Sequence, residues 1–203
     1  MSRLVDDLLL LARSDAGVQS MRFEPLDLNE AARLAAARWI PQLHLAAVEL
    51  SNFTCKQEAI IYADRSSIER LLDILLENAC KYSPHGGRIE LSTSADAGSV
   101  VRSVSDSGIG IPPEQQEKIF ERFYRVNPAN DGSSQAQGSG LELALARQIT
   151  EVHRAQIEVQ SEPGKGSSFF VQFERLIREP ASPNANSQLI TRDAMRVVNQ
   201  PEV

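Results

Sequence analysis

The chain has 203 residues, 42% of them hydrophobic and 24% charged, which is the composition of a folded globular protein with one domain and flanking segments. Its formal net charge is −6 at pH 7, so the chain lacks the surplus of Lys and Arg expected of a protein that binds nucleic acid. The longest apolar run near the N-terminus, residues 8–12, is far shorter than the roughly 20 residues of a membrane-spanning helix. We therefore expect a cytoplasmic chain that binds no nucleic acid and has no membrane span.

The first predicted element is an amphipathic helix over residues 2–16. Leu4, Leu8 and Leu11 recur at the spacing of one helix face, and Gly17 would end the helix. A helix of about 15 residues is marginal in water on its own. This apolar stripe would therefore have to pack on the following domain or on a partner helix.

A second helix is predicted over residues 28–44. Asn29 or Asp27 would cap its N-terminus, and Pro41, which lacks a backbone N–H, would mark its end. A strand-like stretch follows at residues 48–54.

Residues 66–82 carry the clearest helical pattern in the chain. Ser66 and Glu69 have the spacing of a capping box, and apolar residues such as Ile68 and Leu75 form a continuous stripe. Beyond it the sequence predicts a β-hairpin of residues 88–94 and 99–105, a glycine-rich turn at 106–113, a short helix at 114–123, a polar loop at 127–140, a helix at 141–153, strands at 156–160 and 168–173, and a disordered tail from about 179.

Three residues project from one face at the end of the helix predicted over 66–82. Asn78 and Lys81 are three positions apart, and Asn78 and Tyr82 are four apart. A carboxamide oxygen can ligate Mg²⁺, an ammonium can neutralise phosphate, and a tyrosine ring can lie over a purine. Taken alone, such a group is more often just the polar edge of an amphipathic helix.

Glycine-rich segments follow at three places. Asp106 ends a predicted strand and precedes a Gly-x-Gly segment, where the backbone can approach a flat ligand and the carboxylate can accept a hydrogen bond from an amine. A second Gly-x-Gly, at residues 138–140, precedes a helix start, where free N–H groups favour anions. A third glycine turn lies at residues 164–169. Each segment alone is also typical of an ordinary turn or linker.

The order of these segments resembles the histidine-kinase branch of the ATPases that share the Bergerat fold with gyrase, Hsp90-type chaperones and mismatch-repair proteins. The likeness covers about residues 50–175. It implies a two-layer α/β (α+β) sandwich, in which about three helices cover one face of a mixed, mostly antiparallel β-sheet, preceded by an N-terminal helix. The matching segments are residues 77–84 for the N box, 106–110 for the G1 box, 119–125 for the F box, 138–143 for the G2 box and 164–169 for the final glycine turn.

The resemblance also assigns the parts of the chain before the predicted tail. Residues 1–17 would be the end of the dimerisation and phosphoacceptor helical hairpin and residues 18–178 the ATP-binding catalytic domain, while the proline-containing, polar composition of residues 179–203 predicts a disordered tail. The implied activity is that of a two-component protein-histidine kinase, which holds Mg·ATP for phosphoryl transfer to a histidine of that hairpin. The implied partners are the hairpin, the receiver domain of a response regulator, and a second copy joined through the N-terminal helix.

The phosphoacceptor histidine would lie on the first helix of that hairpin, which the resemblance places before residue 1. His44, His85 and His153 have none of its sequence context. We interpret all three as ordinary surface or turn histidines.

By similarity, the nucleotide site would combine residues from every matching segment. Asn78 would ligate Mg²⁺, Lys81 would contact phosphate, Tyr82 would lie near adenine and Asp106 would bind its amine. The two phenylalanines of the F box would anchor a lid loop, residues 126–137, on the core. The residues implied to bind the nucleotide are Asn78, Lys81, Tyr82, Asp106, Gly108, Gly110, Phe120, Arg122, Phe123, Arg125, Gly138, Gly140, Leu141 and Ser167.

Two positions depart from the family pattern. Ile74 stands where the N box usually has a second polar residue, so one Mg²⁺ ligand would be missing. Glu142 stands where the G2 box usually has a third glycine, and its carboxylate would repel a triphosphate: two like charges about 4 Å apart cost roughly 1 kcal/mol in bulk water. Glu142 could instead point outward from the first helical turn, where acidic residues interact favourably with the helix dipole.

These departures keep a second function open beside the kinase. The chain could be a degenerate, non-catalytic nucleotide-binding or protein-interaction module that regulates a partner. An ATP hydrolase of the gyrase or chaperone type is disfavoured by the F box and by the lack of a glutamate at position 74. Binding of Mg·ATP at submillimolar concentration would favour the kinase over the non-catalytic module.

Overall fold

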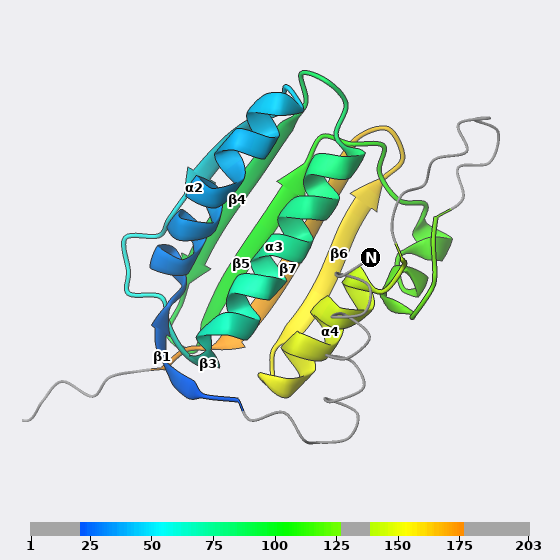
Figure 1. Ribbon diagram of the computed structural model, residues 1–203. Helices are drawn as coiled ribbons and strands as arrows, with labels where there is room; N and C mark the ends of the chain where they lie inside the picture. The colour runs from blue at the N-terminus through cyan, green and yellow to red at the C-terminus, as the bar shows by residue number, and fades with distance from the viewer. Residues whose placement is uncertain (1–20, 127–138, 177–203) are drawn as a thin grey trace, which may run out of the picture.

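Three helices cover one face of a β-sheet in the computed structural model, which describes residues 21–126 and 139–176 (Figure 1). This arrangement confirms the predicted two-layer sandwich. The predicted helix at residues 2–16, most of the lid loop and the tail lie outside the described residues. The elements are β1 (Phe23–Asp27), α2 (Leu28–Leu45), β2 (Glu49–Phe53), β3 (Ile60–Asp64), α3 (Arg65–Tyr82), β4 (Arg88–Ala95), β5 (Ser99–Asp106), the 3₁₀ turns η1 (Pro113–Gln115) and η2 (Lys118–Phe120), α4 (Glu142–Val152), β6 (Gln156–Glu162) and β7 (Gly166–Glu174).

The main sheet has the strand order β2-β4-β5-β7-β6. Its hairpins β4–β5 and β6–β7 are antiparallel, as is the central pair β5–β7. Only β2 and β4 run parallel, and α3 lies on the connection between them, as a parallel pair requires a long crossover. The sheet is therefore mixed and mostly antiparallel, as predicted.

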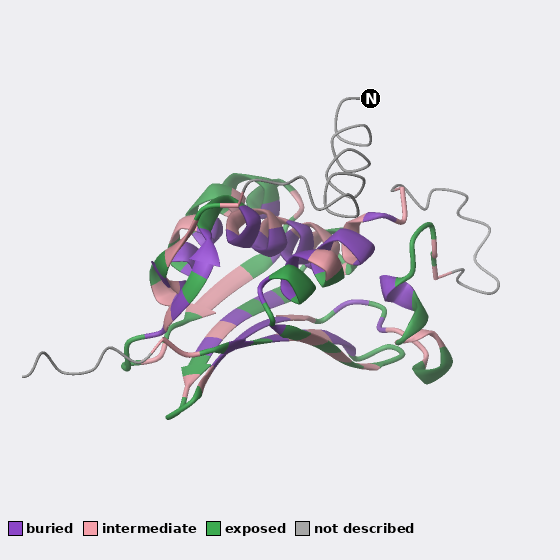
Figure 2. Cartoon of the chain, turned by 90° about the horizontal axis from the view of Figure 1, so that it is seen from below, coloured by how far each residue is buried: buried purple, intermediate pink, exposed green. Residues whose placement is uncertain are grey.

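The two faces of this sheet differ because residues alternate along each strand. Buried apolar residues such as Leu91, Val104 and Val171 point toward the helices and form the core between the layers (Figure 2). On the other face, serine hydroxyls pair across strands, as between the Oγ atoms of Ser92 and Ser103, which are 2.7 Å apart. One face of the sheet is thus packed against the helices, and the other is largely polar, with a few apolar residues such as Phe170.

Helix α2 runs past the proline that was predicted to end it. Asp27 caps its N-terminus by accepting a hydrogen bond from the backbone N–H of Asn29 (2.9 Å), so Asp27 is the N-cap. Pro41 lies inside the helix, where it removes one backbone hydrogen bond. The carbonyl that loses this bond belongs to Ala37, which is exposed to water, and the last turn buries Leu43.

Helix α3 begins one residue earlier than predicted and has a different cap. The carboxylate of Asp64 accepts a hydrogen bond from the backbone N–H of Ser67 (2.9 Å), so the predicted capping box at Ser66 is wrong. The apolar stripe is buried as predicted. It includes Ile74, which is 1% exposed and faces the core.

Two further features differ from the prediction. Strands β1 and β3 form a separate antiparallel pair that the sequence pattern did not reveal. The helix predicted at residues 114–123 is instead two 3₁₀ turns, η1 and η2. The Gln116 side chain ties this segment to the sheet by donating to the carbonyls of Ile111 (3.0 Å) and Ser161 (2.8 Å).

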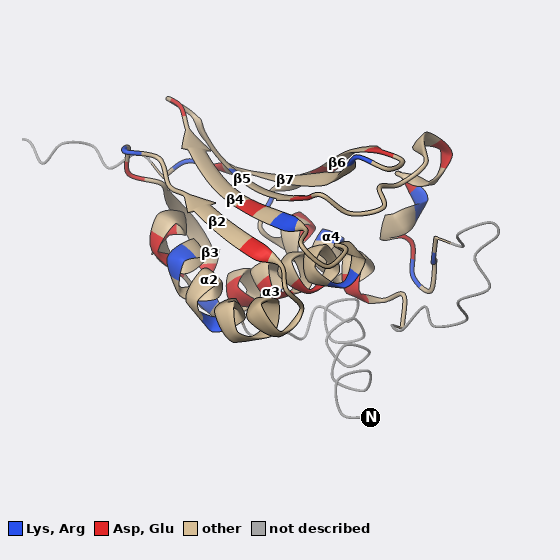
Figure 3. Cartoon of the chain, turned by 90° about the horizontal axis from the view of Figure 1, so that it is seen from above, with Lys and Arg blue, Asp and Glu red and all other residues tan. Residues whose placement is uncertain are grey.

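Charged residues of both signs are spread over the helices, the loops and several strands (Figure 3). None of the helices in the described part of the chain is both long enough and apolar enough to cross a membrane.

Candidate functional site

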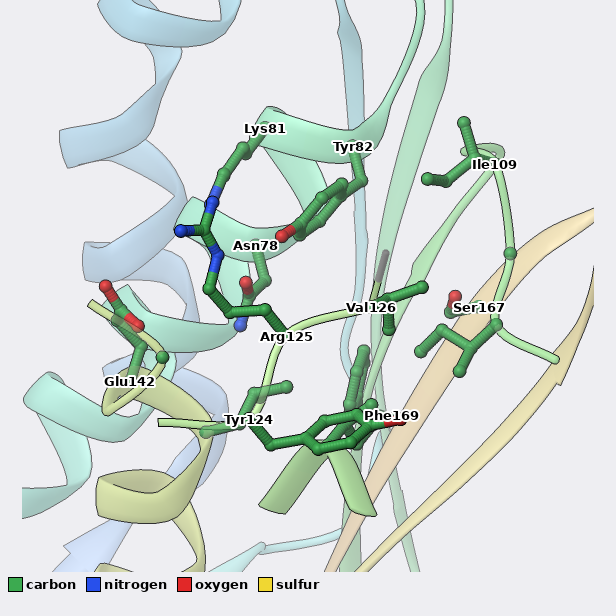
Figure 4. Close-up of a pocket in the computed structure, with 15 residues that line it drawn as sticks. Asn78, Lys81, Tyr82, Ile109, Tyr124, Arg125, Val126, Glu142, Ser167 and Phe169 are labelled. Atoms are coloured by element: carbon green, nitrogen blue, oxygen red, sulfur yellow. The ribbon is translucent and has the colours of Figure 1, made fainter. Parts of the chain in front are cut away.

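A pocket opens beside the C-terminal end of α3. Its other walls are the loop after β5, the segment after η2 and the start of α4, with β7 at its base (Figure 4). These are the glycine-rich and polar segments that the sequence singled out. The pocket is lined by Asn78, Lys81, Tyr82, Ile109, Gly110, Ile111, Ile119, Tyr124, Arg125, Val126, Gly140, Glu142, Leu143, Ser167 and Phe169.

Helix α3 contributes the three residues that were predicted to share a face. Asn78, Lys81 and Tyr82 all line the pocket, which confirms their common orientation. The Nδ2 atom of Asn78 is buried and has no hydrogen-bond partner among the described residues. The ammonium of Lys81 lies 4.9 Å from the centre of the Tyr82 ring, within the range of a cation–π contact. An amide, a cation and an aromatic ring thus meet at one end of this helix.

Asp106 lies beside the pocket and is not among the residues that line it. Its Oδ1 accepts a hydrogen bond from the backbone N–H of Gly108 (2.8 Å), and it stands opposite Ser167 in the β5–β7 register. Burial raises the pKa of the Asp106 carboxyl, while backbone hydrogen bonds from Gly108 and Ser167 lower it to a smaller extent. Ser167, its neighbour on β7, does line the pocket.

The loop after β5 needs glycine at two positions. A Cβ on Gly108 would collide with the Tyr82 carbonyl and with the Asp106 carboxylate, so glycine lets the loop pack against the end of α3. Gly110 has φ 71° and a Cβ there would collide with the carbonyl of Glu162. Gly110 lines the pocket, whereas Gly108 supports it from behind.

The F box segment does only part of what was expected of it. Phe120 is 9% exposed and packs edge-on against Phe169, with ring centres 6.4 Å apart. Phe123 is 66% exposed, so the expectation that its ring anchors the lid on the core is wrong. Its backbone N–H instead donates to the carbonyl of Gly140 (2.8 Å), which ties this segment to the start of α4. Arg125 lines the pocket and Arg122 does not.

At the start of α4, the Glu142 side chain faces the pocket and does not point outward from the helix. Its Oε1 accepts a hydrogen bond from the backbone N–H of Ser139 (3.1 Å), and its Oε2 accepts one from that of Leu141 (3.0 Å). The side chain therefore turns back over the helix N-terminus and lines the pocket. Gly140 also lines the pocket, the side chain of Leu141 is buried in the core, and Gly138 lies outside the described residues.

The pKa of Glu142 is below its ordinary value. Burial raises it, but hydrogen bonds from the backbone N–H groups of Glu142 and Ser139 and from the Ser139 hydroxyl, together with attraction by Lys81, lower it by more. The carboxylate is therefore ionised at neutral pH. A negative charge is held at the end of the pocket nearest α4.

Sequence reasoning missed the apolar part of the pocket. These side chains come from four separate segments, and in the sequence several of them have the spacing of ordinary core residues. The only feature that could have indicated an apolar wall is the position of two isoleucines, one between the glycines of the G1 box and one after them. The apolar lining residues that were not predicted are Ile109, Ile111, Ile119, Tyr124, Val126, Leu143 and Phe169.

The histidines are distributed differently from what we expected. His44 and His85 are exposed, as predicted for surface histidines. His153 is 8% exposed, so it is not a surface histidine, although it does lie in the turn that follows α4. It ends α4, and its ring packs against Phe23 with centres 5.0 Å apart.

Comparison with known proteins agrees with this geometry. The family model described as histidine kinase-, DNA gyrase B-, and HSP90-like ATPase matches residues 63–177, more than half of the 203 residues. The chain therefore belongs to this family of ATPases, and within it corresponds to the ATP-binding catalytic domain of histidine kinases.

Individual relatives support the same assignment. The sensor histidine kinase RppB of Synechocystis sp. is 37% identical over 172 residues, which are 85% of this chain and 37% of the relative. The solved catalytic domain of the histidine kinase ThkA matches with a TM-score of 0.67 and 27% identity, over 76% of this chain and 97% of that one. Full-length ShkA in complex with AMPPNP matches with a TM-score of 0.75 and 27% identity, over 88% of this chain and 36% of that one. The chain thus spans just over a third of the length of a curated relative such as RppB.

Proposed function

We propose that this domain binds Mg·ATP in the pocket at the end of α3 and presents its γ-phosphate to a histidine of a phosphoacceptor hairpin. The observation that carries the proposal is that Asn78, Lys81 and Tyr82 line one pocket together with Gly110 and the start of α4. The family to which the chain belongs and the AMPPNP bound by ShkA support an adenine nucleotide as the ligand.

The adenine would occupy the apolar side of the pocket. Ile109, Ile111 and Phe169 offer apolar contact there, and Tyr82 is 41% exposed at the rim. The exocyclic amine of adenine would donate a hydrogen bond to Asp106, whose position beside the base of the pocket is fixed by Gly108. This pairing would distinguish adenine from a base that has a carbonyl in place of the amine.

The phosphates would lie on the polar side, near Lys81, Arg125 and the N-terminus of α4. Mg²⁺ would be held by the amide of Asn78, because Ile74 at the other usual position is buried and apolar. The buried Nδ2 atom of Asn78 has no partner among the described residues, so an acceptor on a bound ligand would satisfy it. One protein ligand is compatible with Mg²⁺, which usually keeps several waters and binds through substrate phosphates. When bound, it would neutralise charge on the transferring phosphoryl group.

The phosphoryl group would pass from the hairpin histidine to the receiver domain of a response regulator. The apolar stripe of residues 2–16 would join two copies of the chain. Because the reaction consumes ATP and acts on receiver domains, we infer a cytoplasmic location for this domain.

Calorimetric titration with Mg·ATP, followed by transfer of labelled phosphate to a purified hairpin that carries the histidine, tests the proposal. Wild-type protein should bind with a submillimolar Kd and label the hairpin. Asp106→Asn keeps an acceptor for Gly108 and should weaken binding by about tenfold or more. Glu151→Gln, an exposed charge change on α4 outside the pocket, should bind like wild type. Absence of binding at millimolar nucleotide would instead favour the non-catalytic module.

A further inference from the structure

The phosphate side of the pocket already holds an anion that belongs to the chain itself. The two carboxylate oxygens of Glu142 accept hydrogen bonds from two different backbone N–H groups, those of Ser139 (3.1 Å) and Leu141 (3.0 Å). The hydroxyl of Ser139 donates to the same carboxylate (3.2 Å). These N–H groups lie at the N-terminus of α4, where backbone donors and the helix dipole favour a negative group.

We propose that Glu142 sets the nucleotide preference of this pocket, because its carboxylate takes the backbone donors that a phosphate would otherwise use. This inference rests on the proposed function, since it concerns the same pocket. It adds a specific consequence: the phosphate chain of a nucleotide contributes little to affinity while Glu142 keeps this position.

Two physical effects act in the same direction. A phosphate that approaches the start of α4 meets a carboxylate of the same charge, and it must displace hydrogen bonds that are already satisfied. Lys81 lines the same pocket and is attracted to Glu142, so part of its charge is already balanced. Adenine recognition on the apolar side involves neither group.

The side chain is placed for this role and not simply for a helix cap. An acidic residue in the first turn commonly interacts with the dipole from the solvent side. Glu142 instead lines the pocket, on the opposite wall from Ile109 and Ser167 (Figure 4). Loss of its carboxylate should therefore change the binding of phosphates and leave the binding of adenosine unchanged. A purely structural cap would affect both ligands alike.

The test is a calorimetric titration of the full chain with adenosine and with ATP, each in excess Mg²⁺. The Kd values of wild-type protein for adenosine and for ATP should lie within about threefold of each other. Glu142→Ala, which is compatible with a helix, should bind ATP at least about tenfold more tightly, with adenosine changed less than about twofold. Glu142→Gln keeps the shape of the side chain and loses its charge. Its affinity for ATP should therefore lie between those of wild type and Glu142→Ala. Glu151→Gln removes a charge from α4 outside the pocket and should match wild type.

The outcomes are distinguishable. If Glu142→Ala binds adenosine normally and ATP no more tightly than wild type does, this inference is overturned and the proposed function stands. A wild-type protein that already prefers ATP over adenosine by far more than threefold overturns it equally. If neither wild type nor any variant binds adenosine or ATP, the proposed function fails and the inference fails with it.

Discussion

The backbone N–H of Asp64, at the start of α3, donates a hydrogen bond to Nε2 of His153, at the end of α4 (3.1 Å). The Nδ1 atom of the same ring lies 2.7 Å from the carbonyl of Ile149. A neutral imidazole with its proton on Nδ1 satisfies both contacts. Burial lowers the pKa of His153, and the Ile149 carbonyl and the Asp64 carboxylate raise it to a smaller extent. A neutral histidine thus links two of the helices that cover the sheet.

Acid should weaken the fold through His153. Its folded pKa lies below the reference value of 6.5, so the unfolded state binds the proton first, and stability that is present above pH 6.5 is lost as pH falls through the folded pKa. The free energy of unfolding in urea, measured from pH 8 to pH 5, should decrease in wild type and change less in His153→Gln. The exposed His44→Gln is the control and should keep the wild-type slope. Equal slopes in all three proteins would contradict this role.

The cap of α3 gives a second prediction. Asp64 accepts hydrogen bonds from Ser66, Ser67 and the backbone of Arg22. Although burial raises its pKa, these bonds lower it by more, to about 2. Asp64→Ala should therefore destabilise the protein by about 1–2 kcal/mol at neutral pH, and Ser66→Ala by clearly less. Since the folded pKa is depressed, this contribution should be lost as pH falls from the reference value of 3.8 through about 2.

Urea denaturation of both cap variants at neutral pH measures this difference. A Ser66→Ala variant as unstable as Asp64→Ala would restore the capping box predicted from the sequence.

A buried arginine in the sheet gives a third prediction. Arg102 is 1% exposed, and its guanidinium donates to Thr93 Oγ1 (2.6 Å) and to Asn52 Oδ1 (3.4 Å), both of which are neutral oxygens. Burial lowers its pKa to about 10. A buried charge of this kind contributes little or negatively to stability. Arg102→Met should therefore leave the free energy of unfolding unchanged or raise it by up to about 3 kcal/mol.

A double-mutant cycle sharpens this prediction. Thr93→Val removes a partner of the charged group and should destabilise wild type by about 1–3 kcal/mol. In the Arg102→Met background the same change should be neutral or stabilising, because the guanidinium is gone. Urea denaturation of the four proteins measures the coupling, and additive effects would show that the arginine does not depend on Thr93.

The main elements of the fold could be predicted because their signals are local. The stripe of residues 66–82 repeats at helical spacing, and the strands of both hairpins alternate around short glycine turns. The pair β1–β3 could not be predicted in this way. Each strand has five residues, β1 contains Pro25, and α2 and β2 lie between the two strands in the sequence. Their stability depends on contacts that no local pattern reveals.

The candidate site could be predicted only in part, for a related reason. Asn78, Lys81 and Tyr82 share a helix face, so their spacing alone predicts that they lie together. The direction of the Glu142 side chain depends on the N–H groups of the preceding loop, and the exposure of Phe123 depends on a backbone φ of 66°. Both follow from tertiary geometry, so residue type and spacing could not decide them.

The central claim is that an adenine nucleotide binds at the end of α3, and the most direct test maps Mg·ATP on the ¹⁵N-labelled chain by NMR. The account predicts saturable shifts of the backbone amides of Gly108, Gly110 and Ser167 and of the side-chain amide of Asn78. Gln156, which lines a separate groove between α4 and β6, should not shift. Shifts confined to that groove, or no shifts at millimolar Mg·ATP, would contradict the account.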